Sequence, residues 1–280
     1  MRRGPLAAGE RVLLVDPKQR RYLVTLHAGA QFHTHSGILA HDDVIGRDEG
    51  STVSATTGRR FVVFRPTLAE VVLKMPRGAQ VIYPKDLGAI LLAADIGPGM
   101  RVLEAGVGSG ALSLALLRAG AEVVGYEVRP DFAAGARANV AAWAGPDVPY
   151  RVEERDVYAG IEERGLDRVV LDLPEPWRAL GAVTEALRPG GIVLAYLPSI
   201  TQVATLRATM AEGPFGMEET SEVLRRTWHV EQRSVRPDHR MVAHTGFLTS
   251  ARLLVPEPQD AEPQDAEPQD AEPQDAEPQD

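Results

Sequence analysis

Three acidic residues stand where apolar, strand-like runs of this chain end, and the first of them opens a glycine-rich segment. Glu104 begins the heptapeptide EAGVGSG, Glu127 ends the run EVVGYE, and Asp156 follows the run YRVEER. An acid about 20 residues beyond a glycine turn is suited to accept hydrogen bonds from both hydroxyls of a ribose. A carboxylate at Asp156 is suited to accept one from an adenine amino group. The three acids together predict a pocket for a ligand that contains a nucleoside.

The glycines of this segment, Gly106, Gly108 and Gly110, are spaced as GxGxG, with Ser109 before the last. Dinucleotide-binding folds use GxGxxG instead, a spacing that lets a pyrophosphate approach the N-terminus of a helix. The carboxylate of Glu104 disfavours phosphate beside the turn and favours a cationic or amino-bearing ligand, such as the methionine part of S-adenosylmethionine. Two structural alternatives stay open, because a glycine run can be only a tight turn and each acid taken singly can be a solvated loop residue.

The segments that must position these residues begin after Pro98, where short apolar runs alternate with segments of helical periodicity. The expected strands are MRVLEAG, EVVGYE, YRVEERD, DRVVLDL and GIVLAYL, and the expected helices are SGALSLALLRAG, DFAAGARANVAAWA, RALGAVTEALRPG and ITQVATLRATMAE. This alternation is typical of a mostly parallel sheet with helices on both faces, in which ligands bind at the carboxyl ends of the strands. We therefore expect a doubly wound, Rossmann-like α/β domain over residues 98–256. Its chemistry is expected directly after Leu103, Tyr126, Glu154, Leu171 and Ala195.

The rest of the chain divides into three parts by composition. Residues 1–66 hold short β-rich runs separated by turn signals, which predict a small N-terminal antiparallel β domain. Residues 67–97 space their apolar side chains at three and four, which predicts a helical connection, within limits set by Pro76 and Pro84. Residues 257–280 are EPQD units joined by alanine. We expect this acidic C-terminal tail to be disordered, because it has no apolar side chain large enough to offset the entropy of ordering.

Composition excludes some classes of protein and suggests a class of partner. The chain has no cysteine, which excludes a disulfide scaffold and cysteine-ligated metal sites, and no apolar stretch approaches the roughly 20 residues that span a bilayer. We expect a cytoplasmic protein. The tail carries five Glu and five Asp, so the net charge of −9 becomes +1 without it, with basic flanks around an acidic middle. Such flanks favour a polyanionic partner, although ordinary scatter of surface charge would look the same.

The segment that ends the fourth expected strand, from Asp172 to Trp177, has the sequence DLPEPW. Methyltransferases that act on exocyclic amines often place an Asn/Asp-Pro-Pro-aromatic motif here, from which this segment departs. It is similar to the Asp-Leu-x-x-Pro-Trp stretch of the tRNA (adenine-N1)-methyltransferases that modify a T-loop adenosine, a family of class I S-adenosylmethionine-dependent methyltransferases. The resemblance covers essentially residues 10–255. It also includes the segments FHTHSG and AHD within 32–42, RPTLAEVVLKMPRGAQVIYPKD at 65–86, RVLEAGVGSGALSL at 101–114, AYLPSITQV at 195–203 and AHTGFL at 243–248.

The resemblance implies a small β domain joined to a catalytic domain, a homotetramer, and methylation of adenine N1 at tRNA position 58 with S-adenosylmethionine as the donor and no metal. The expected cofactor-binding residues are Glu104, Gly106, Gly108, Ser109, Gly110, Glu127, Asp156 and Asp172. Tyr83 and Tyr196 match aromatic positions that the family places near the cofactor and the target base, where a tyrosine ring can stack on a flipped adenine. The alternative for both is a half-buried core tyrosine. The EPQD tail has no counterpart in the family.

The chemistry needs little from the protein beyond alignment. N1 of adenine carries an in-plane lone pair, so no base is required, and the enzyme must align nitrogen, carbon and sulfur and exclude water. The base gains positive charge that it shares with its exocyclic amine, and a carboxylate that accepts a hydrogen bond from this amine would stabilise that charge. Asp172 is the candidate for this catalytic role. The alternative is that Asp172 caps a helix that starts near Trp177.

Histidines and arginines outside this pocket suggest contacts with RNA. His33, His35 and His41 have no cysteine beside them and only loosely spaced carboxylates, so we expect RNA or interdomain contacts rather than zinc, whereas His244 is expected to be structural. Extraction of a base from folded tRNA costs roughly a few kcal/mol, which contacts to the RNA backbone must offset. If arginines supply these contacts from one face at the mouth of the site, affinity for tRNA should fall steeply with salt. The candidate arginines are Arg2, Arg3, Arg20, Arg21, Arg59, Arg60, Arg225, Arg226, Arg233, Arg236 and Arg240.

Other functions stay open at this level. A class I methyltransferase that acts on a protein or a small molecule would share the fold and the pocket. An RNA-binding protein that has lost catalysis would keep the basic flanks and would not depend on Asp172. A nucleotide-dependent oxidoreductase is disfavoured by Glu104 and by the GxGxG spacing.

Overall fold

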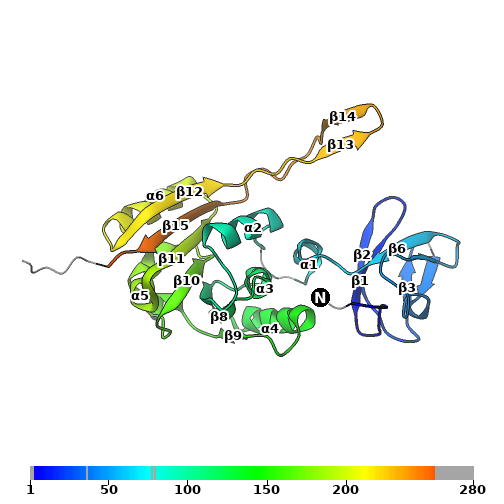
Figure 1. The fold of residues 1–280 in the computed structure, drawn as a ribbon, viewed down its shortest axis with the longest axis horizontal. Coiled ribbons are helices and arrows are strands. Elements are labelled where there is room, and N and C mark those ends of the chain that lie inside the picture. The colour runs from blue at the N-terminus through cyan, green and yellow to red at the C-terminus, as the bar shows by residue number, and fades with distance from the viewer. Residues whose placement is uncertain (1–2, 36, 77, 79, 256–280) are drawn as a thin grey trace, which may run out of the picture.

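The structure, a computed structural model, describes residues 3–35, 37–76, 78 and 80–255. The prediction for the tail at 257–280 lies outside these residues. Among the helices described, none is both long and apolar enough to cross a bilayer. The chain forms a small antiparallel sheet near its N-terminus and a large sheet with helices on both faces, placed side by side along the longest axis of the molecule (Figure 1).

In the small sheet, every second side chain of a strand faces one shared hydrophobic core. Its strands are β1 (Arg11–Val15), β2 (Arg21–Thr25), β5 (Thr52–Ser54) and β6 (Arg60–Phe64), in the antiparallel order β2-β1-β6-β5. Val12 and Leu14 of β1 meet Phe61 and Val63 of β6 in this core. The predicted small β domain is thereby confirmed. Sequence patterns did not predict the hairpin of β3 (Gln31–Thr34) and β4 (Gly37–Ala40), because each strand has only four residues and little apolar alternation.

Two short helices connect the sheets. α1 (Leu68–Lys74) begins at a capping box in which the Glu70 N–H donates to the Thr67 hydroxyl at 3.4 Å and the Thr67 N–H donates to Glu70 Oε2 at 2.9 Å. α2 (Pro84–Ala93) has Pro84 in its first turn, where the missing N–H has no partner to lose. Both helices fall within the segment predicted to be helical.

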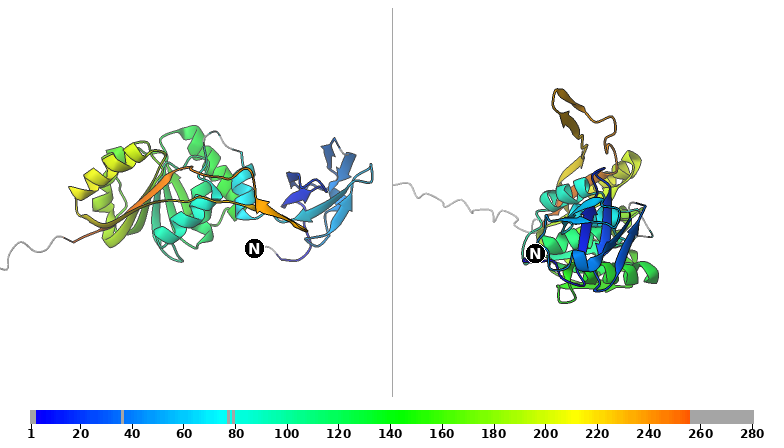
Figure 2. Two further views of the ribbon diagram at one scale, coloured as in Figure 1. Left: turned by 90° about the horizontal axis from the view of Figure 1, so that it is seen from above. Right: turned by 90° about the vertical axis from the view of Figure 1, so that its right-hand side faces the viewer.

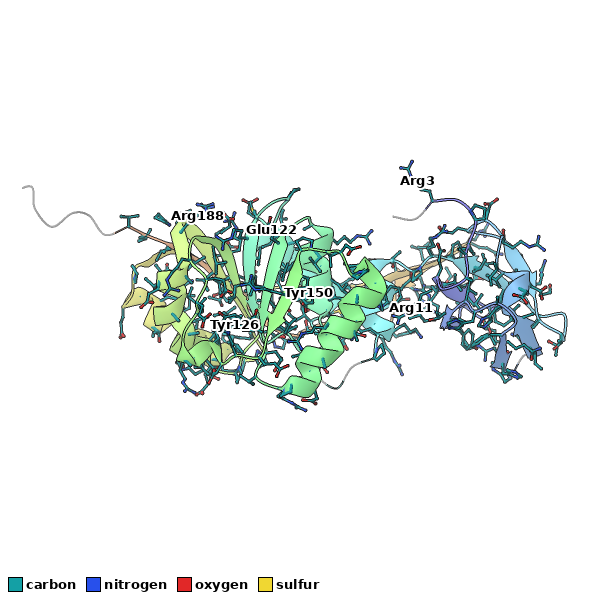
Figure 3. The ribbon with its side chains drawn as sticks, turned by 90° about the horizontal axis from the view of Figure 1, so that it is seen from below. Arg3, Arg11, Glu122, Tyr126, Tyr150 and Arg188 are labelled. Carbon is teal, nitrogen blue, oxygen red and sulfur yellow. The ribbon has the colours of Figure 1, made fainter. Side chains whose placement is uncertain are left out.

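The small sheet also contacts the large unit directly. Lys74 Nζ of α1 donates to the carbonyl oxygen of Arg21 at 3.1 Å. The Arg11 guanidinium lies 4.6 Å from the ring centroid of Trp143, near the end of α4 (Pro130–Ala144). Figure 3 shows Arg11 in the space between the two units. These contacts join β1 and β2 to helices that cover the large sheet.

The large sheet has the strand order β12-β15-β11-β10-β7-β8-β9. Its strands are β7 (Arg101–Ala105), β8 (Glu122–Tyr126), β9 (Tyr150–Glu153), β10 (Leu166–Leu171), β11 (Leu187–Leu197), β12 (Phe215–Glu222) and β15 (Phe247–Leu253). The five strands from β11 to β9 are parallel, and β15 runs antiparallel to both its neighbours. The predicted Rossmann-like fold is confirmed, as a mixed sheet. Because the chain adds strands first on one side of β7 and then on the other, the topological switch point lies between β7 and β10.

Helices cover both faces of this sheet (Figure 1). α1, α2, α3 (Ala111–Arg118) and α4 contribute to the core on one face, and α5 (Leu180–Ala186) and α6 (Ile200–Ala211) contribute to the core on the other. Successive residues of β10 show why its sequence is continuously apolar, since Val170 packs in the first core and Val169 in the second. The helices that pack on both faces therefore fix the positions of the strand ends.

Between β12 and β15 the chain leaves the sheet as a projecting hairpin. β13 (Trp228–Glu231) and β14 (Ser234–Pro237) form a two-stranded sheet of their own. We call residues 223–244 the arm. Figures 1 and 2 show that the arm leaves the large sheet at β12 and β15 and extends toward the end of the molecule where the small sheet lies. Trp228, Val230 and Val235 on the arm are 59%, 71% and 60% exposed. Neither β12 nor the arm was among the strands predicted from the sequence.

Candidate functional site

The glycine turn lies at the switch point of the sheet, between the end of β7 and the start of α3. Gly106 has φ +87° and Gly110, the residue before α3, has φ +81°. A Cβ on Gly106 would lie 2.1 Å from the carbonyl oxygen of Asp172, so only glycine permits this approach of the turn to the end of β10. The Asp172 N–H in turn donates to the Ala105 carbonyl at 2.9 Å. The turn and Asp172 are thus held together by backbone contacts.

Glu104 is buried in β7 beside this turn. Its Oε2 accepts a 2.6 Å hydrogen bond from the Ser113 hydroxyl, whose oxygen lies 3.1 Å from the Tyr150 hydroxyl. Its Oε1 is buried and has no hydrogen-bond partner among the described residues. Burial, with smaller contributions from the charges of Asp172 and Glu127, raises the pKa of Glu104 to about 8. A buried acid with one unsatisfied oxygen is a site prepared for a donor or a cation.

Asp172 directly follows β10 and faces the same space. Burial, followed by the charge of Glu127, raises the pKa of Asp172 to about 7. The alternative in which Asp172 caps a helix is wrong, because the next helical segment, the 3-10 helix η3 (Pro176–Ala179), has Glu175 at its N-cap. Asp172, Glu104, Gly106, Gly108 and Ser109 line one small cavity, together with residues of the segment 80–82.

Glu127 lies at the next strand end and supports the turn from the side. Its Oε2 accepts from the Gly108 N–H at 3.0 Å, and its Oε1 accepts from the Arg129 N–H at 3.0 Å. A carboxylate oxygen can accept more than one hydrogen bond, so these contacts leave acceptor capacity for ligand hydroxyls. Glu127 therefore holds Gly108 in place and keeps the ability to bind that the sequence predicted for it.

Asp156 is placed differently from the other three acids. Its side chain is exposed and its Oδ1 accepts from the Tyr158 N–H at 2.9 Å, which caps the 3-10 helix η2 (Val157–Ala159). It lines a separate open hollow with Arg155, Glu162 and neighbouring residues rather than the cavity of Glu104 and Asp172. Asp156 thus has a local structural role, and its contact with an adenine ring stays a prediction.

The two tyrosines are in different surroundings. Tyr196 of β11 is 9% exposed and packs with the core under α2 and α3, and burial raises its pKa to about 12. The charges of Asp86 and Asp172 also act on this hydroxyl, so its polar end lies toward the site. Tyr83 is half-buried at the N-cap of α2, directly after Ile82 of the cavity lining. The ring of Tyr196 is a core side chain and its hydroxyl faces charged groups.

Sequence patterns missed the residues that support the acids. Ser113 is in the first turn of α3 and is fully buried, and Tyr150 begins β9. Figure 3 shows Tyr150 on the large sheet beside the helix α4. Ser113 could have been identified from the sequence, because it is a polar residue within the otherwise apolar helix segment ALSLALLR. No comparable signal distinguished Tyr150 from a core tyrosine.

Two of the candidate histidines, His41 and His244, have scaffold roles. His41, in the 3-10 helix η1 (His41–Asp43), is buried; its Nδ1 accepts from the His27 N–H at 3.0 Å and the two rings stack. The prediction of RNA or interdomain contacts is therefore wrong for His41, whose buried ring packs against His27 of the same small β domain. His244 Nδ1 lies 2.9 Å from Glu222 Oε2 and its Nε2 3.0 Å from the Pro198 carbonyl, which joins the arm to β12. In the described ranges, no group of three His, Asp or Glu side chains is arranged to hold a metal ion.

The predicted basic face is divided between two parts of the chain. Arg20 and Arg59 form ion pairs with Asp16 and Arg21 pairs with Glu70, all near the small sheet. The late arginines lie on the arm, at the same end of the molecule (Figure 2). Arg2 lies outside the described residues. The ion pairs reduce the number of free guanidinium groups that the small sheet offers to a polyanion.

Comparison with known proteins extends over both units. Residues 4–53 match the family model described as TrmI-like N-terminal, and residues 61–245 match the model described as tRNA methyltransferase complex GCD14 subunit. The chain is 42% identical over 245 residues to the tRNA (adenine(58)-N(1))-methyltransferase TrmI of Thermus thermophilus, covering 86% of this chain and 96% of that protein. It is 33% identical over 276 residues to the tRNA (adenine(57)-N(1)/adenine(58)-N(1))-methyltransferase TrmI of Methanocaldococcus jannaschii, covering 89% and 96%.

Two solved structures are similar along nearly the whole chain. The tRNA (m1A58) methyltransferase TrmI of Aquifex aeolicus superposes with a TM-score of 0.80 at 31% identity, covering 90% of this chain and 100% of that one. A protein of Thermotoga maritima described as a SAM-dependent O-methyltransferase superposes with a TM-score of 0.86 at 32% identity, covering 90% and 96%.

Proposed function

Because the chain belongs to the TrmI family of tRNA (adenine58-N1)-methyltransferases, we propose that it transfers a methyl group from S-adenosylmethionine to N1 of the T-loop adenosine at tRNA position 58. One observation carries this proposal: the 42% identity to a relative of this activity runs through 86% of the chain. The matched region of 61–245 contains the glycine turn, Asp172 and Tyr196. The chemistry of these residues supports the same conclusion.

The residues at the switch point fit S-adenosylmethionine. Glu104 offers a buried oxygen that has no hydrogen-bond partner within the described part of the chain, and the charges of Asp172 and Glu127 add to its own. In the part of the chain that the structure describes, no lysine or arginine forms an ion pair with any of the three. Such a cluster of unpaired acids is unfavourable until a positively charged ligand binds. When bound, the ligand supplies a methyl group on a positively charged sulfur.

Each side chain then has a proposed part in the reaction. Glu104 and the turn of Gly106, Gly108, Ser109 and Gly110 hold the amino acid portion of the donor, and Glu127 and Asp156 hold its nucleoside. Asp172 accepts a hydrogen bond from the exocyclic amine of the adenine and stabilises the positive charge that develops on the base. No group has to remove a proton from N1, so alignment provides most of the rate. Tyr83 and Tyr196 flank the target base: the half-buried ring of Tyr83 stacks on it, which contributes about 1–3 kcal/mol, and Tyr196 presents its hydroxyl.

The affinity for S-adenosylmethionine should rise with pH up to about 8. Because the pKa of Glu104 is raised to about 8, the free protein carries this acid protonated at lower pH, and binding of an ammonium group favours its ionised form. Binding therefore releases a proton below pH 8, and affinity should increase by up to about tenfold per pH unit before it levels off. Calorimetric titration between about pH 6 and 7.5 measures this.

Glu104→Gln is the matched control for this titration, since glutamine has the same shape and does not ionise. The variant reports the pH dependence that comes from the ligand and from the other acids. We expect a shallower pH dependence for Glu104→Gln than for the wild type. Equal slopes for the two proteins would show that Glu104 does not contact the charged end of the ligand.

We further propose that four chains assemble through their arms. An isolated two-stranded hairpin is marginally stable in water, and the arm exposes Trp228, Val230 and Val235 together. Burial of these side chains against other copies of the chain would stabilise both the arm and the assembly. Light scattering on the purified protein should give four times the 30.3 kDa mass of the chain. A mass of one chain would exclude this assembly.

Nucleoside mass spectrometry tests the proposed function. Unmodified tRNA transcript, S-adenosylmethionine and the protein should yield N1-methyladenosine, and a transcript with guanosine at position 58 should yield none. The assay also separates methylation on a base nitrogen from methylation on oxygen, the outcome that the similarity to an O-methyltransferase would suggest. Methyl transfer to a protein or metabolite pool in place of tRNA would contradict the proposal.

A further inference from the structure

Two segments 160 positions apart in the sequence meet in a ring of polar contacts beside Tyr196. Lys85 Nζ donates to Asp86 Oδ1 at 2.7 Å and to the Thr245 hydroxyl oxygen at 2.5 Å. The Thr245 hydroxyl donates to Asp86 Oδ2 at 2.6 Å, which closes the ring. Lys85 and Asp86 belong to the segment IYPKD at the start of α2, and Thr245 belongs to the segment AHTGFL before β15.

This ring is buried at a cost in free energy. The side chains of Lys85 and Asp86 are 4% and 0% exposed. Burial of an ion pair costs hydration free energy, and the attraction between the two charges often does not offset this cost. Apolar residues of the same size often stabilise a fold as well or better. The ring therefore does not simply add stability to the core. Its value lies in fixing the position of the groups that contact it.

Those groups are the two tyrosines proposed to flank the target base. The side chains of Thr245 and Asp86 both act on the pKa of the Tyr196 hydroxyl. On the other side, a Cβ on Gly246 would lie 2.4 Å from Cζ and 2.8 Å from the hydroxyl oxygen of Tyr196. The aromatic ring of Tyr196 thus fits closely against Gly246, the residue that directly follows Thr245. The Asp86 N–H donates to the Tyr83 carbonyl at 2.9 Å, so the same residue also holds the backbone of Tyr83.

We propose that Lys85, Asp86 and Thr245 form a buried clamp that positions Tyr196 and Tyr83 for methyl transfer. The role in catalysis rests on the proposed function. These three are positioning residues, since they act through the tyrosines and not on the reacting atoms. Small displacements of positioning groups can lower a rate by about 10²-fold, so the clamp should affect kcat more than the binding of the methyl donor.

A double-mutant cycle between Thr245 and Tyr196 tests the clamp. Thr245→Val removes the hydroxyl and keeps the shape, and it should lower kcat on tRNA about tenfold or more with little change in the affinity for S-adenosylmethionine. Thr245→Ser, which restores the hydroxyl, should recover most of the rate. In the Tyr196→Phe background, Thr245→Val should cause little further loss, because the group through which it acts is gone. A full additional loss there, or a wild-type kcat for Thr245→Val, would overturn the proposal.

Thr249→Val is the matched control. Thr249 is fully buried on β15 and its hydroxyl oxygen lies 3.0 Å from that of Thr220, so this variant also removes one hydroxyl contact. Its partner on β11 is Ala195, which packs in the core on the face opposite to Tyr196. We expect Thr249→Val to keep the kcat of the wild type. A loss of rate as large as that of Thr245→Val would show a general effect of sheet stability.

Two further measurements keep the proposal testable if Thr245→Val does not fold or if tRNA is not the substrate. Gly246→Ala places a methyl group against the aromatic ring of Tyr196 and should lower kcat. This loss should largely disappear in a Tyr196→Ala background, and an undiminished loss there would contradict the clamp. In protein labelled with 3-fluorotyrosine, the ¹⁹F signal assigned to Tyr196 should shift or broaden in Thr245→Val, or in Thr245→Ala as its substitute, and not in Thr249→Val. An unchanged signal overturns the clamp without reference to activity, whereas an inactive wild type refutes only the proposed reaction.

Discussion

Replacement of Asp172 by asparagine should lower kcat for methyl transfer about 10²–10³-fold while S-adenosylmethionine still binds. Asparagine keeps the shape of the side chain but cannot offer a negative charge to the amine of the adenine. The partly buried position of Asp172 makes this loss large, because the surroundings provide little water to stabilise the developing charge instead. Single-turnover rates on tRNA and calorimetry with the methyl donor measure the two effects separately.

Glu175→Gln is the control from the same DLPEPW segment. The side chain of Glu175 is 47% exposed and forms an ion pair with Arg178 at 2.8 Å, so its loss should leave kcat unchanged. The wild-type rate should also fall as the pH drops through and below about 7, because burial raises the pKa of Asp172 to about 7 and only the ionised form accepts the hydrogen bond. Full activity of Asp172→Asn would mean that Asp172 is not the group that stabilises the base.

Replacement of Gly106 by alanine should disrupt the site more broadly. The new Cβ would lie 2.1 Å from the Asp172 carbonyl oxygen, a backbone atom held by the sheet, and the residue has φ +87°. The left-handed conformation alone costs an ordinary residue about 1–2 kcal/mol, and relief of the clash must move the turn away from β10. We expect a loss of about 3 kcal/mol or more in the free energy of unfolding and at least about a tenfold loss of affinity for S-adenosylmethionine.

Gly135→Ala provides the comparison for this variant. Gly135 lies within α4, and a Cβ there would meet no atom within 4 Å. Alanine is favoured over glycine in a helix, so this change should stabilise the protein by about 0.5–1 kcal/mol. Urea unfolding measures both variants. A Gly106→Ala protein as stable as the wild type, with unchanged affinity, would show that the turn can move without loss.

Local patterns were sufficient to predict the strands that carry the acids. The runs around Glu104, Glu127 and Asp172 are apolar and end in turn residues, and ends of parallel strands on either side of a switch point necessarily come close in space. The same reasoning placed Asp156 at a strand end but could not show that its carboxylate caps η2. A strand end specifies the edge of the sheet where a side chain lies, not the direction in which it points.

The arm and β12 were not predicted because their segments lack the apolar alternation of a buried strand. Residues of β12 from Glu218 onward and most of the arm are polar or exposed, so no hydrophobic period distinguished them from loops. Pairing with β15 decides the structure of β12, and that partner lies some 30 residues further along the chain. His41 was misassigned for a related reason, since its type suggested a surface contact and its burial came from packing against His27.

By itself, the sequence of this protein determined the alternating strands and helices that carry the acids, the position of the glycine turn, the acids at the strand ends and the family resemblance, because periodicity and turn chemistry are properties of neighbouring residues. Only the tertiary structure decided which of those acids are buried and carry a raised pKa, that Gly106 touches the backbone of Asp172, and that Lys85 and Asp86 meet Thr245 beside Tyr196. Burial and contacts between residues far apart in the chain arise when the helices and strands pack, and no local pattern contains them.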